Sequence, residues 1–180
     1  MAKKILVVHC SPRKGGNSSM LADKFIEGAE AAGNTIQRID IGHDEIRGCR
    51  ACEYCFTHDG ECVQQDHMQL YYRYLREYDV LVWATPMYFY SFPGQMRCFQ
   101  DRMFCQIGKP FTIKSTALLL CFEDEDASRA DPTVNSYRVC ADYCKLENLG
   151  EVIVNGVYEK GAIEGNPGLQ SAYELGKSIS

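Results

Sequence analysis

Five stretches of aliphatic residues recur along the chain, with segments of helical character between and after them. These stretches predict strands at residues 4–10, 35–41, 79–85, 115–121 and 151–158. The predicted helices cover residues 17–32, 65–78, 93–106, 132–149 and 166–177. Continuous apolar runs are typical of strands buried on both faces of a sheet. Strands that alternate with helices pair in parallel through right-handed crossovers, so the sequence predicts a doubly wound α/β fold.

The length and composition agree with a single domain spanning residues 1–180. The chain has 180 residues, of which 46% are hydrophobic and 24% charged, and this is enough to build one buried core. Its net charge of −5 argues against nucleic acid as a partner. The apolar run at the N-terminus is too short for a signal peptide, and no run approaches the roughly 20 residues of a membrane span. We therefore expect a cytoplasmic protein with no membrane partner.

Three loops leave the carboxyl ends of predicted strands, at residues 11–19, 86–93 and 122–131. In a doubly wound sheet, ligands bind at these ends, at the point where the strand order reverses. We therefore expect the three loops to converge on one ligand site.

The first of these loops, SPRKGGNSS, has the composition of a phosphate-binding loop. Its glycines let the backbone approach a ligand, and it offers polar donors from Ser11, Arg13, Asn17, Ser18 and Ser19. The following helix begins within the loop, so its N-terminus adds partial positive charge. Neither of the two common nucleotide-binding glycine motifs is present. A polar turn with ordinary helix caps is the alternative, and the position directly after the first strand favours phosphate.

The second loop, TPMYFYSFP, places aromatic residues at a strand end between two prolines. A flat apolar ring needs such a surface, together with backbone groups for its polar edge. A hydrophobic loop that covers the core or a subunit interface is the alternative. The position at the switch point of the sheet favours a bound ring.

Together, SPRKGGNSSMLA and TPMYFYSFPGQMRCFQDR resemble the flavodoxin-like NADPH-dependent FMN reductases, and the resemblance covers nearly the whole chain. It implies a flavodoxin-like sheet of five parallel strands in the order 2-1-3-4-5, with bound FMN. It also implies NADPH or NADH as electron donor and a homodimer or homotetramer. The FMN contacts that it implies are Ser11, Arg13, Asn17, Ser18 and Ser19 for the phosphate, Pro86, Met87, Tyr88, Phe89 and Tyr90 for the ring, and Phe122, Glu123 and Asp124 after the fourth strand.

Four cysteines lie close together in an insert at residues 48–63. Cys49, Cys52, Cys55 and Cys62 have the spacing C-x2-C-x2-C-x6-C. Thiolates at such spacing bind soft metal centres, either an iron–sulfur cluster or zinc. The spacing resembles the compact motif of the iron–sulfur flavoproteins, a branch of the same family, and this implies a [4Fe–4S] cluster. Zinc would also accept four thiolates, although structural zinc sites usually divide into two knuckles. Free thiols and a disulfide are further alternatives, because exposed clusters are lost in air.

Two further expectations concern the surroundings of these sites. The cysteine segment follows the second strand, so we expect a cluster on the FMN side of the sheet, where it can pass single electrons to FMN. The helix at residues 65–78 carries Tyr71, Tyr72, Tyr74 and Tyr78, more aromatic residues than one buried face needs, which favours a subunit interface. The six other cysteines are expected to pack in the core.

The sequence thus predicts an FMN-dependent oxidoreductase without a catalytic acid, base or nucleophile of its own. Electrons would enter from NAD(P)H or a ferredoxin and leave to a small acceptor such as a quinone or another flavin. No NAD(P)-binding fingerprint is present, so nicotinamide use depends on the resemblance. The alternatives are a non-enzymatic flavodoxin-like electron carrier and a cysteine-based redox sensor.

Overall fold

The computed structural model describes residues 2–180 and contains a five-stranded parallel sheet. Its strands lie in the order β2-β1-β3-β4-β5, and each neighbouring pair is parallel. Their bounds are β1 (Lys4–His9), β2 (Thr35–Asp40), β3 (Val80–Pro86), β4 (Ser115–Cys121) and β5 (Glu147–Val154). The flavodoxin-like order predicted from the sequence is confirmed.

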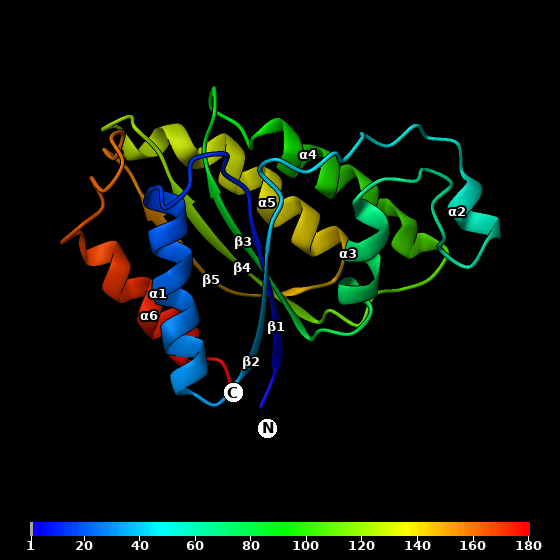
Figure 1. The fold of residues 1–180 in the computed structure, drawn as a ribbon, viewed down its shortest axis with the longest axis horizontal. Coiled ribbons are helices and arrows are strands. Elements are labelled where there is room, and N and C mark those ends of the chain that lie inside the picture. Colours follow the sequence, from blue (N-terminus) through cyan, green and yellow to red (C-terminus); the bar gives the residue numbers. More distant parts are fainter. Residues whose placement is uncertain (1) are drawn as a thin grey trace.

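Helices cover both faces of this sheet (Figure 1). On one face lie α1 (Asn17–Ala31) and α6 (Pro167–Lys177). On the other lie α3 (Met68–Leu75), α4 (Gly94–Arg102) and α5 (Asp131–Tyr143). Shorter turns of helix are α2 (Tyr54–Thr57), η1 (Met103–Ile107) and η2 (Ala127–Ala130). In Figure 1, α2 stands at the outer end of the α3–α4 layer, away from the sheet.

The sheet separates two hydrophobic cores, and the alternation of side chains along β1 shows how. Ile5 and Val7 pack with α1 and α6, whereas Leu6 and Val8 pack with the opposite helical layer. This is the two-residue period of a strand with both faces buried. Within the residues that the structure describes, no helix combines the length and apolar composition needed to cross a bilayer.

Close packing of α1 against α6 depends on glycine in both helices. A β-carbon on Gly28 would collide with the carbonyl of Tyr173, and one on Gly176 with the carbonyl of Phe25. Because the colliding atoms are backbone, a larger side chain at either position would force the helices apart.

Two expectations about local structure were wrong. The helix predicted at 132–149 ends at Tyr143, and β5 begins at Glu147 rather than at residue 151. Lys145 has a left-handed φ of 55° and reverses the chain between them. Asn148 and Gly150 are weak strand formers, so the first half of this edge strand carries little strand pattern.

The tyrosines of α3 and its C-terminal end do not form a spare aromatic face. Tyr71 and Tyr72 are buried in the core, and Tyr74 and Tyr78 are partly buried against it. The argument for a subunit interface from these tyrosines was therefore wrong, because one protomer already packs them.

Candidate functional site

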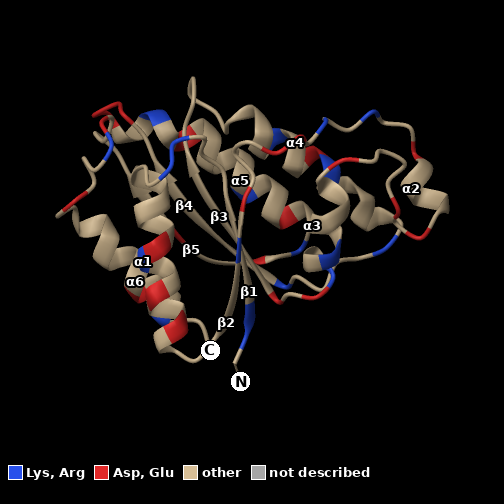
Figure 2. Ribbon diagram, in the orientation of Figure 1, with Lys and Arg blue, Asp and Glu red and all other residues tan. Residues whose placement is uncertain are grey.

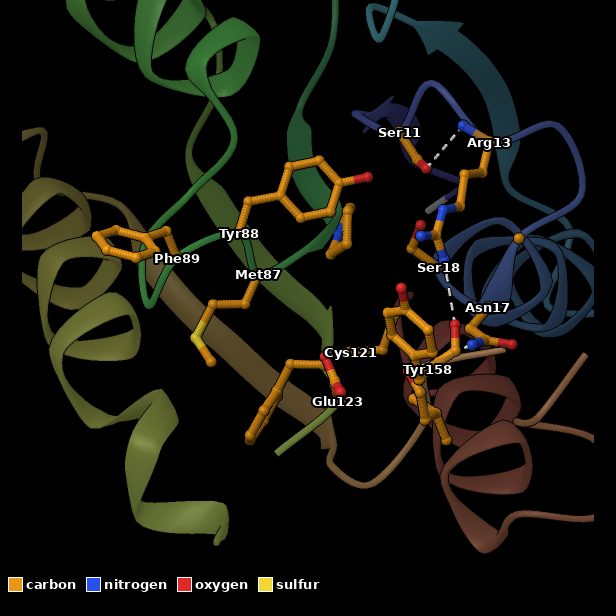
Figure 3. A pocket seen from close by; sticks show the side chains of 14 residues that line it. Ser11, Arg13, Asn17, Ser18, Met87, Tyr88, Phe89, Cys121, Glu123 and Tyr158 are labelled. Carbon is orange, nitrogen blue, oxygen red and sulfur yellow. Dashed lines mark hydrogen bonds between the residues drawn. The ribbon is translucent and has the colours of Figure 1, made fainter. Parts of the chain in front are cut away.

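The three predicted loops meet at the carboxyl edge of the sheet and enclose a pocket of about 270 Å³ (Figure 3). Its lining residues come from the ends of four strands. They are Ser11, Arg13, Gly16, Asn17, Ser18, Pro86, Met87, Tyr88, Phe89, Cys121, Phe122, Glu123, Val157 and Tyr158. Figure 3 shows Tyr88 of the β3 loop directed toward Ser11 and Arg13 of the first loop, with Met87 and Phe89 on the far side of it. The pocket therefore has a hydrogen-bonding end and a hydrophobic end.

The polar end is built from the turn between β1 and α1. Gly15 has a left-handed φ of 61°, and the Ser11 hydroxyl accepts a hydrogen bond from the Arg13 backbone nitrogen at 3.2 Å. Helix α1 begins at Asn17, and Gly16 and Ser18 line the pocket beside it. Free N–H groups of the first helical turn and the helix dipole favour an anion here.

Two of the predicted phosphate contacts use their side chains elsewhere. The Asn17 amide donates to the carbonyl of Glu159 at 2.9 Å and accepts from the backbone nitrogen of Gly161 at 3.1 Å. The Ser19 hydroxyl accepts from Arg38 at 2.9 Å and lines a neighbouring cavity on the β2 side. Ser11, Arg13 and Ser18 are the predicted phosphate contacts whose side chains remain available at this pocket.

The segment after β5 completes the polar end, and the sequence reasoning missed it. Arg13 donates to the carbonyl of Tyr158 at 3.1 Å, and its guanidinium lies 5.3 Å from the centre of the Tyr158 ring. Val157 also lines the pocket. A signal was available, because these residues end the predicted strand at 151–158, and the carboxyl end of that strand must lie at the same edge of a parallel sheet. The structure ends β5 earlier, at Val154, which leaves Val157 and Tyr158 in the loop after it.

The aromatic end consists of a tight turn that holds bulky residues in left-handed conformations. Tyr88 and Ser91 exchange two backbone hydrogen bonds, at 2.9 and 3.1 Å, and the residues between them have φ values of 47° (Phe89) and 61° (Tyr90). Such φ values are unusual for non-glycine residues, and strained conformations cluster at ligand sites. Phe89 is 98% exposed, so this loop does not serve to cover the core.

A second cavity of about 600 Å³ adjoins the aromatic end. Its lining is apolar on one side, with Met87, Phe89, Tyr90 and Phe122, and acidic on the other, with Glu123, Asp124 and Glu125. The acidic residues form the red segment after β4 in Figure 2. Met87, Phe89, Phe122 and Glu123 line both cavities, so a molecule in one lies directly beside a molecule in the other.

Cys121 is the one thiol on the wall of the 270 Å³ pocket among the described residues. Burial raises its pKa to about 12, so it is a neutral thiol at physiological pH. Burial likewise raises the pKa of Cys10 to about 12. Both are core residues, in agreement with the expected packing role for cysteines outside the insert.

The four cysteines of the insert surround a separate cavity of about 250 Å³. Cys49, Cys52, Cys55 and Cys62 all line it, together with apolar side chains that include Phe56, Val63 and Phe104. All ten cysteines of the chain carry free thiols. The pKa of Cys55 is raised, first by burial and also by the neighbouring thiols of Cys62, Cys49 and Cys52. The structure thus brings the four predicted ligands to one place.

Left-handed backbone at three non-glycine positions winds the cysteine segment around this cavity. Ala51, Glu53 and Asp59 have φ values of 49°, 57° and 51°. Within residues 2–180, no three Cys, His, Asp or Glu side chains meet at one point as ligands of a single metal ion would. The donor set itself, four thiols that line one cavity, is the one that iron–sulfur clusters use.

A buried ion pair fastens this segment to the α3–α4 layer. Arg102 donates to Asp66 at 2.7 Å, and both side chains are only 1% exposed. Arg102 also donates to the carbonyl of Arg47 at 2.9 Å, so one side chain holds both ends of the segment. A β-carbon on Gly108 would collide with the carbonyl of Cys55, which shows how closely the segment packs on η1.

The two cofactor-sized cavities do not share a lining residue. Phe104, which follows α4, lines the cysteine cavity and not the pocket at the sheet edge. The expected position of a cluster on the FMN side of the sheet, where it could pass electrons to FMN, stays a prediction.

Comparison with known proteins agrees with these features. Residues 3–131 match the sequence profile of the NADPH-dependent FMN reductase family. The chain is 27% identical to an iron–sulfur flavoprotein of Methanosarcina thermophila, over 98% of this chain and 93% of that protein. It is 37% identical to an iron–sulfur flavoprotein of Archaeoglobus fulgidus over 93 residues, which are 52% of this chain and only 42% of that relative.

Solved structures add the fold. An NAD(P)H:quinone oxidoreductase from Methanothermobacter marburgensis superposes with a TM-score of 0.80 at 15% identity, covering 100% of both chains. An azoreductase superposes with a TM-score of 0.72 at 17% identity, covering 98% of this chain and all of that one. These likenesses confirm the flavodoxin-like architecture, and the family match confirms the predicted class of oxidoreductase. The chain belongs to the NADPH-dependent FMN reductase family.

Proposed function

We propose that the chain is an FMN-dependent oxidoreductase that carries an iron–sulfur cluster and reduces a small acceptor. The observation that carries this proposal is the 270 Å³ pocket, whose two ends match the two ends of FMN. Phosphate-type donors lie at one end, and flat aromatic and apolar surface lies at the other. Both ends lie at the carboxyl edge of the sheet, where doubly wound proteins bind nucleotides.

The residues divide between the two parts of the cofactor. Ser11, Arg13 and Ser18, with the first N–H groups of α1, would hold the phosphate. The flavin ring would contact Met87, Tyr88, Phe89 and Phe122, as the resemblance to the FMN reductases implies. FMN, when bound, supplies transfer of one or two electrons, and the protein sets its orientation and access.

The four cysteines would hold a [4Fe–4S] cluster. Their thiols line one cavity together with apolar side chains, and two relatives of the chain are named iron–sulfur flavoproteins. Such a cluster, when bound, supplies single-electron transfer. The two cavities share no lining residue, so each group would be held by its own set of side chains.

The cavity of about 600 Å³ beside the ring pocket is the proposed acceptor site. Its apolar side suits a flat ring such as a quinone or a flavin. Its other side has Glu123, Asp124 and Glu125, and the cation near them, Arg129, lies 3.3 Å from Asp126 and 4.0 Å from Asp124. Negative charge at this entrance favours neutral or cationic acceptors over anionic ones.

The proposal extends to the electron donors, the oligomeric state and the compartment of the protein. NADPH or NADH would reduce FMN directly, and a ferredoxin would deliver single electrons through the cluster. A homodimer or homotetramer would shield the exposed Phe89 turn, and the cytoplasm would keep the ten thiols reduced.

Anaerobic purification tests the two cofactors directly. The protein is expected to show a flavin spectrum with extractable FMN, and about four iron and four sulfide per chain. A colourless protein that does not bind FMN at micromolar concentration would refute the flavin assignment. Flavin without iron or sulfide would refute the cluster and leave thiols or zinc. Steady-state oxidation of NADPH or NADH with a quinone separates a reductase from an electron carrier, which would show almost none.

A further inference from the structure

A buried histidine lies directly beneath the phosphate loop and has no part in the flavin site as described so far. His9, the last residue of β1, is 2% exposed. Its Nδ1 lies 2.6 Å from Asp40 Oδ1, and its Nε2 lies 3.1 Å from Ser18 Oγ. Ser18 in turn lines the pocket proposed for FMN. Two polar side chains, Ser18 and His9, therefore connect this pocket to Asp40 at the end of β2.

The Asp40 contact determines which ring nitrogen of His9 carries a proton. Burial alone would raise the pKa of Asp40, but hydrogen bonds from Arg38 and His9 outweigh it, and the pKa is lowered. An ionised carboxylate can only accept, so Nδ1 is the donor in the 2.6 Å contact. Arg38 Nη2, 3.2 Å from the same nitrogen, then finds no lone pair there, and its hydrogen bonds go to Ser19 and Asp40. Because Nδ1 always carries a proton here, the His9 ring is neutral when Nε2 is unprotonated and positively charged when Nε2 is protonated.

The state of Nε2 determines what Ser18 presents to the pocket. With neutral His9, the Ser18 hydroxyl must donate to Nε2, which leaves only lone pairs to face a ligand. With protonated His9, Nε2–H donates to Ser18 Oγ, and the hydroxyl proton no longer points at Nε2. It can then turn toward a ligand in the pocket, in competition with the Cys121 sulfur beside it. A phosphate oxygen accepts hydrogen bonds and is repelled by a lone pair, so the two states differ in their affinity for phosphate.

Charged groups on each side of His9 set the balance between these states. Burial lowers its pKa most, and the Arg38 guanidinium lowers it further, while Asp40 and Asp23 act in the opposite direction. The cavity on the β2 side, which His9 lines, is also lined by two cationic side chains and a second histidine: Arg13, Lys14 and His43. On β3, the uncharged Ala84 is its partner. The net pKa of His9 is below its usual value of about 6.5, so the ring is neutral at pH 7 when the pocket is empty.

A phosphate monoester reverses this balance, since it brings up to two negative charges to the far side of the Ser18 hydroxyl. We propose that Asp40, His9 and Ser18 form a proton relay in which phosphate binding draws one proton from solvent onto His9 Nε2. The protonated ring then holds Ser18 as a donor to the phosphate. No covalent bond forms or breaks other than the N–H bond at Nε2. The inference rests on the proposed FMN site and makes His9 a positioning residue for it.

The test compares FMN with riboflavin, which has the same ring and no phosphate, between pH 5.5 and 8.5. Binding is followed by flavin fluorescence, and proton uptake by calorimetry in two buffers of different ionisation heat. For FMN, we expect uptake of about one proton, and a Kd that rises by up to about tenfold per pH unit between the His9 pKa values of the empty and loaded protein. Riboflavin should show neither effect.

His9→Gln supplies the matched control, because its amide can donate to Ser18 without titrating. Its FMN profile should lose the His9 component and keep only the titration of the phosphate itself. Asp40→Asn, at a partly exposed position, should lower the pH at which uptake occurs. In the unmodified protein, NMR titration of the four histidines should show a rise in the pKa of His9 alone when FMN is added.

Each outcome decides the inference. Equal proton uptake with FMN and riboflavin, or an unchanged profile in His9→Gln, would overturn the relay while leaving FMN binding intact. If His9→Gln does not fold, an unshifted His9 signal on adding FMN overturns it equally. Absence of FMN binding at every pH would overturn the proposed function, and the relay with it.

Discussion

The phosphate loop at residues 11–19 and the cysteine segment at residues 47–66 are both cofactor-sized sites, but the chain builds them differently. The phosphate loop is short and lies between a buried strand and a long helix, so the sheet sets its position. The cysteine segment contains only the four-residue helix α2 and depends on side chains from distant parts of the chain. Arg102 holds both of its ends, and Gln69 donates to the carbonyls of Cys62 and Gln64 at 2.8 and 2.7 Å.

The difference indicates that either site can lose its structure while the other stays folded. The FMN pocket shares its backbone with the core of the sheet, so it should persist as long as the protein is folded. In the cysteine segment, two of the four proposed ligands, Cys49 and Cys52, are exposed, and the segment contains no strand of the sheet. The free energy of local opening is lower for a segment of this kind than for the core of the sheet.

The largest effect is expected from removing one thiol. Cys52→Ser should abolish most of the iron and sulfide bound after anaerobic purification, because a hydroxyl is a poor cluster ligand. FMN content should stay at the level of the unmodified protein, since the two cavities share no residue. Iron, sulfide and flavin assays measure both. Cys98→Ser is the control, because Cys98 is partly buried on α4 and does not line the cysteine cavity. Full iron content in Cys52→Ser would contradict the four-ligand assignment.

Arg102→Met tests the anchor of the cysteine segment. It leaves Asp66 buried without its partner, and breaking a buried ion pair in this way costs about 3–5 kcal/mol. We expect that loss in the free energy of unfolding measured with urea, together with loss of iron. Arg97→Met, on the exposed side of the same helix, should change stability by less than about 0.5 kcal/mol. An iron content that survives the loss of Arg102 would show that the cluster itself orders the segment.

Arg13→Ala tests the polar end of the FMN pocket. Loss of a hydrogen bond to a charged group should weaken FMN by about 1.5–3 kcal/mol, seen as a higher Kd in fluorescence titration. Riboflavin affinity should change much less, since it has no phosphate. Lys14→Ala is the control from the same loop, because Lys14 lines the neighbouring cavity and not this pocket. Equal weakening by both variants would mean that only overall charge matters.

The smallest effect is expected at the acidic side of the acceptor cavity. Glu125→Gln removes one exposed charge, which is worth up to about 1 kcal/mol for a partner of unit charge. The kcat/KM for a sulfonated quinone should rise by up to about fivefold relative to that for its uncharged analogue. The difference should shrink with added salt, because exposed charges are screened. No change in the ratio between the two quinones would place the acceptor elsewhere.

The sequence alone determined the sheet and the first two loops of the FMN pocket. Apolar runs such as Ile5–Val8 mark strands, because burial on both faces requires a continuous hydrophobic pattern. The alternation with helices requires parallel pairing, and parallel pairing brings the loops at residues 11–19 and 86–93 to one edge. The family match agrees with this reading, because the matched residues 3–131 include both loops.

Only the tertiary structure decided how individual side chains are used. The sequence pattern predicts Asn17 as a phosphate contact, but in the folded chain its side-chain amide hydrogen-bonds to the segment after β5. Arg102 and Asp66, 36 residues apart, carry no local sign of their pairing. The same holds for His9, whose partners Ser18 and Asp40 belong to different elements. Periodicity reports which face of an element is buried, but a hydrogen-bond partner depends on which distant element is packed there, and that is settled only when the chain is folded.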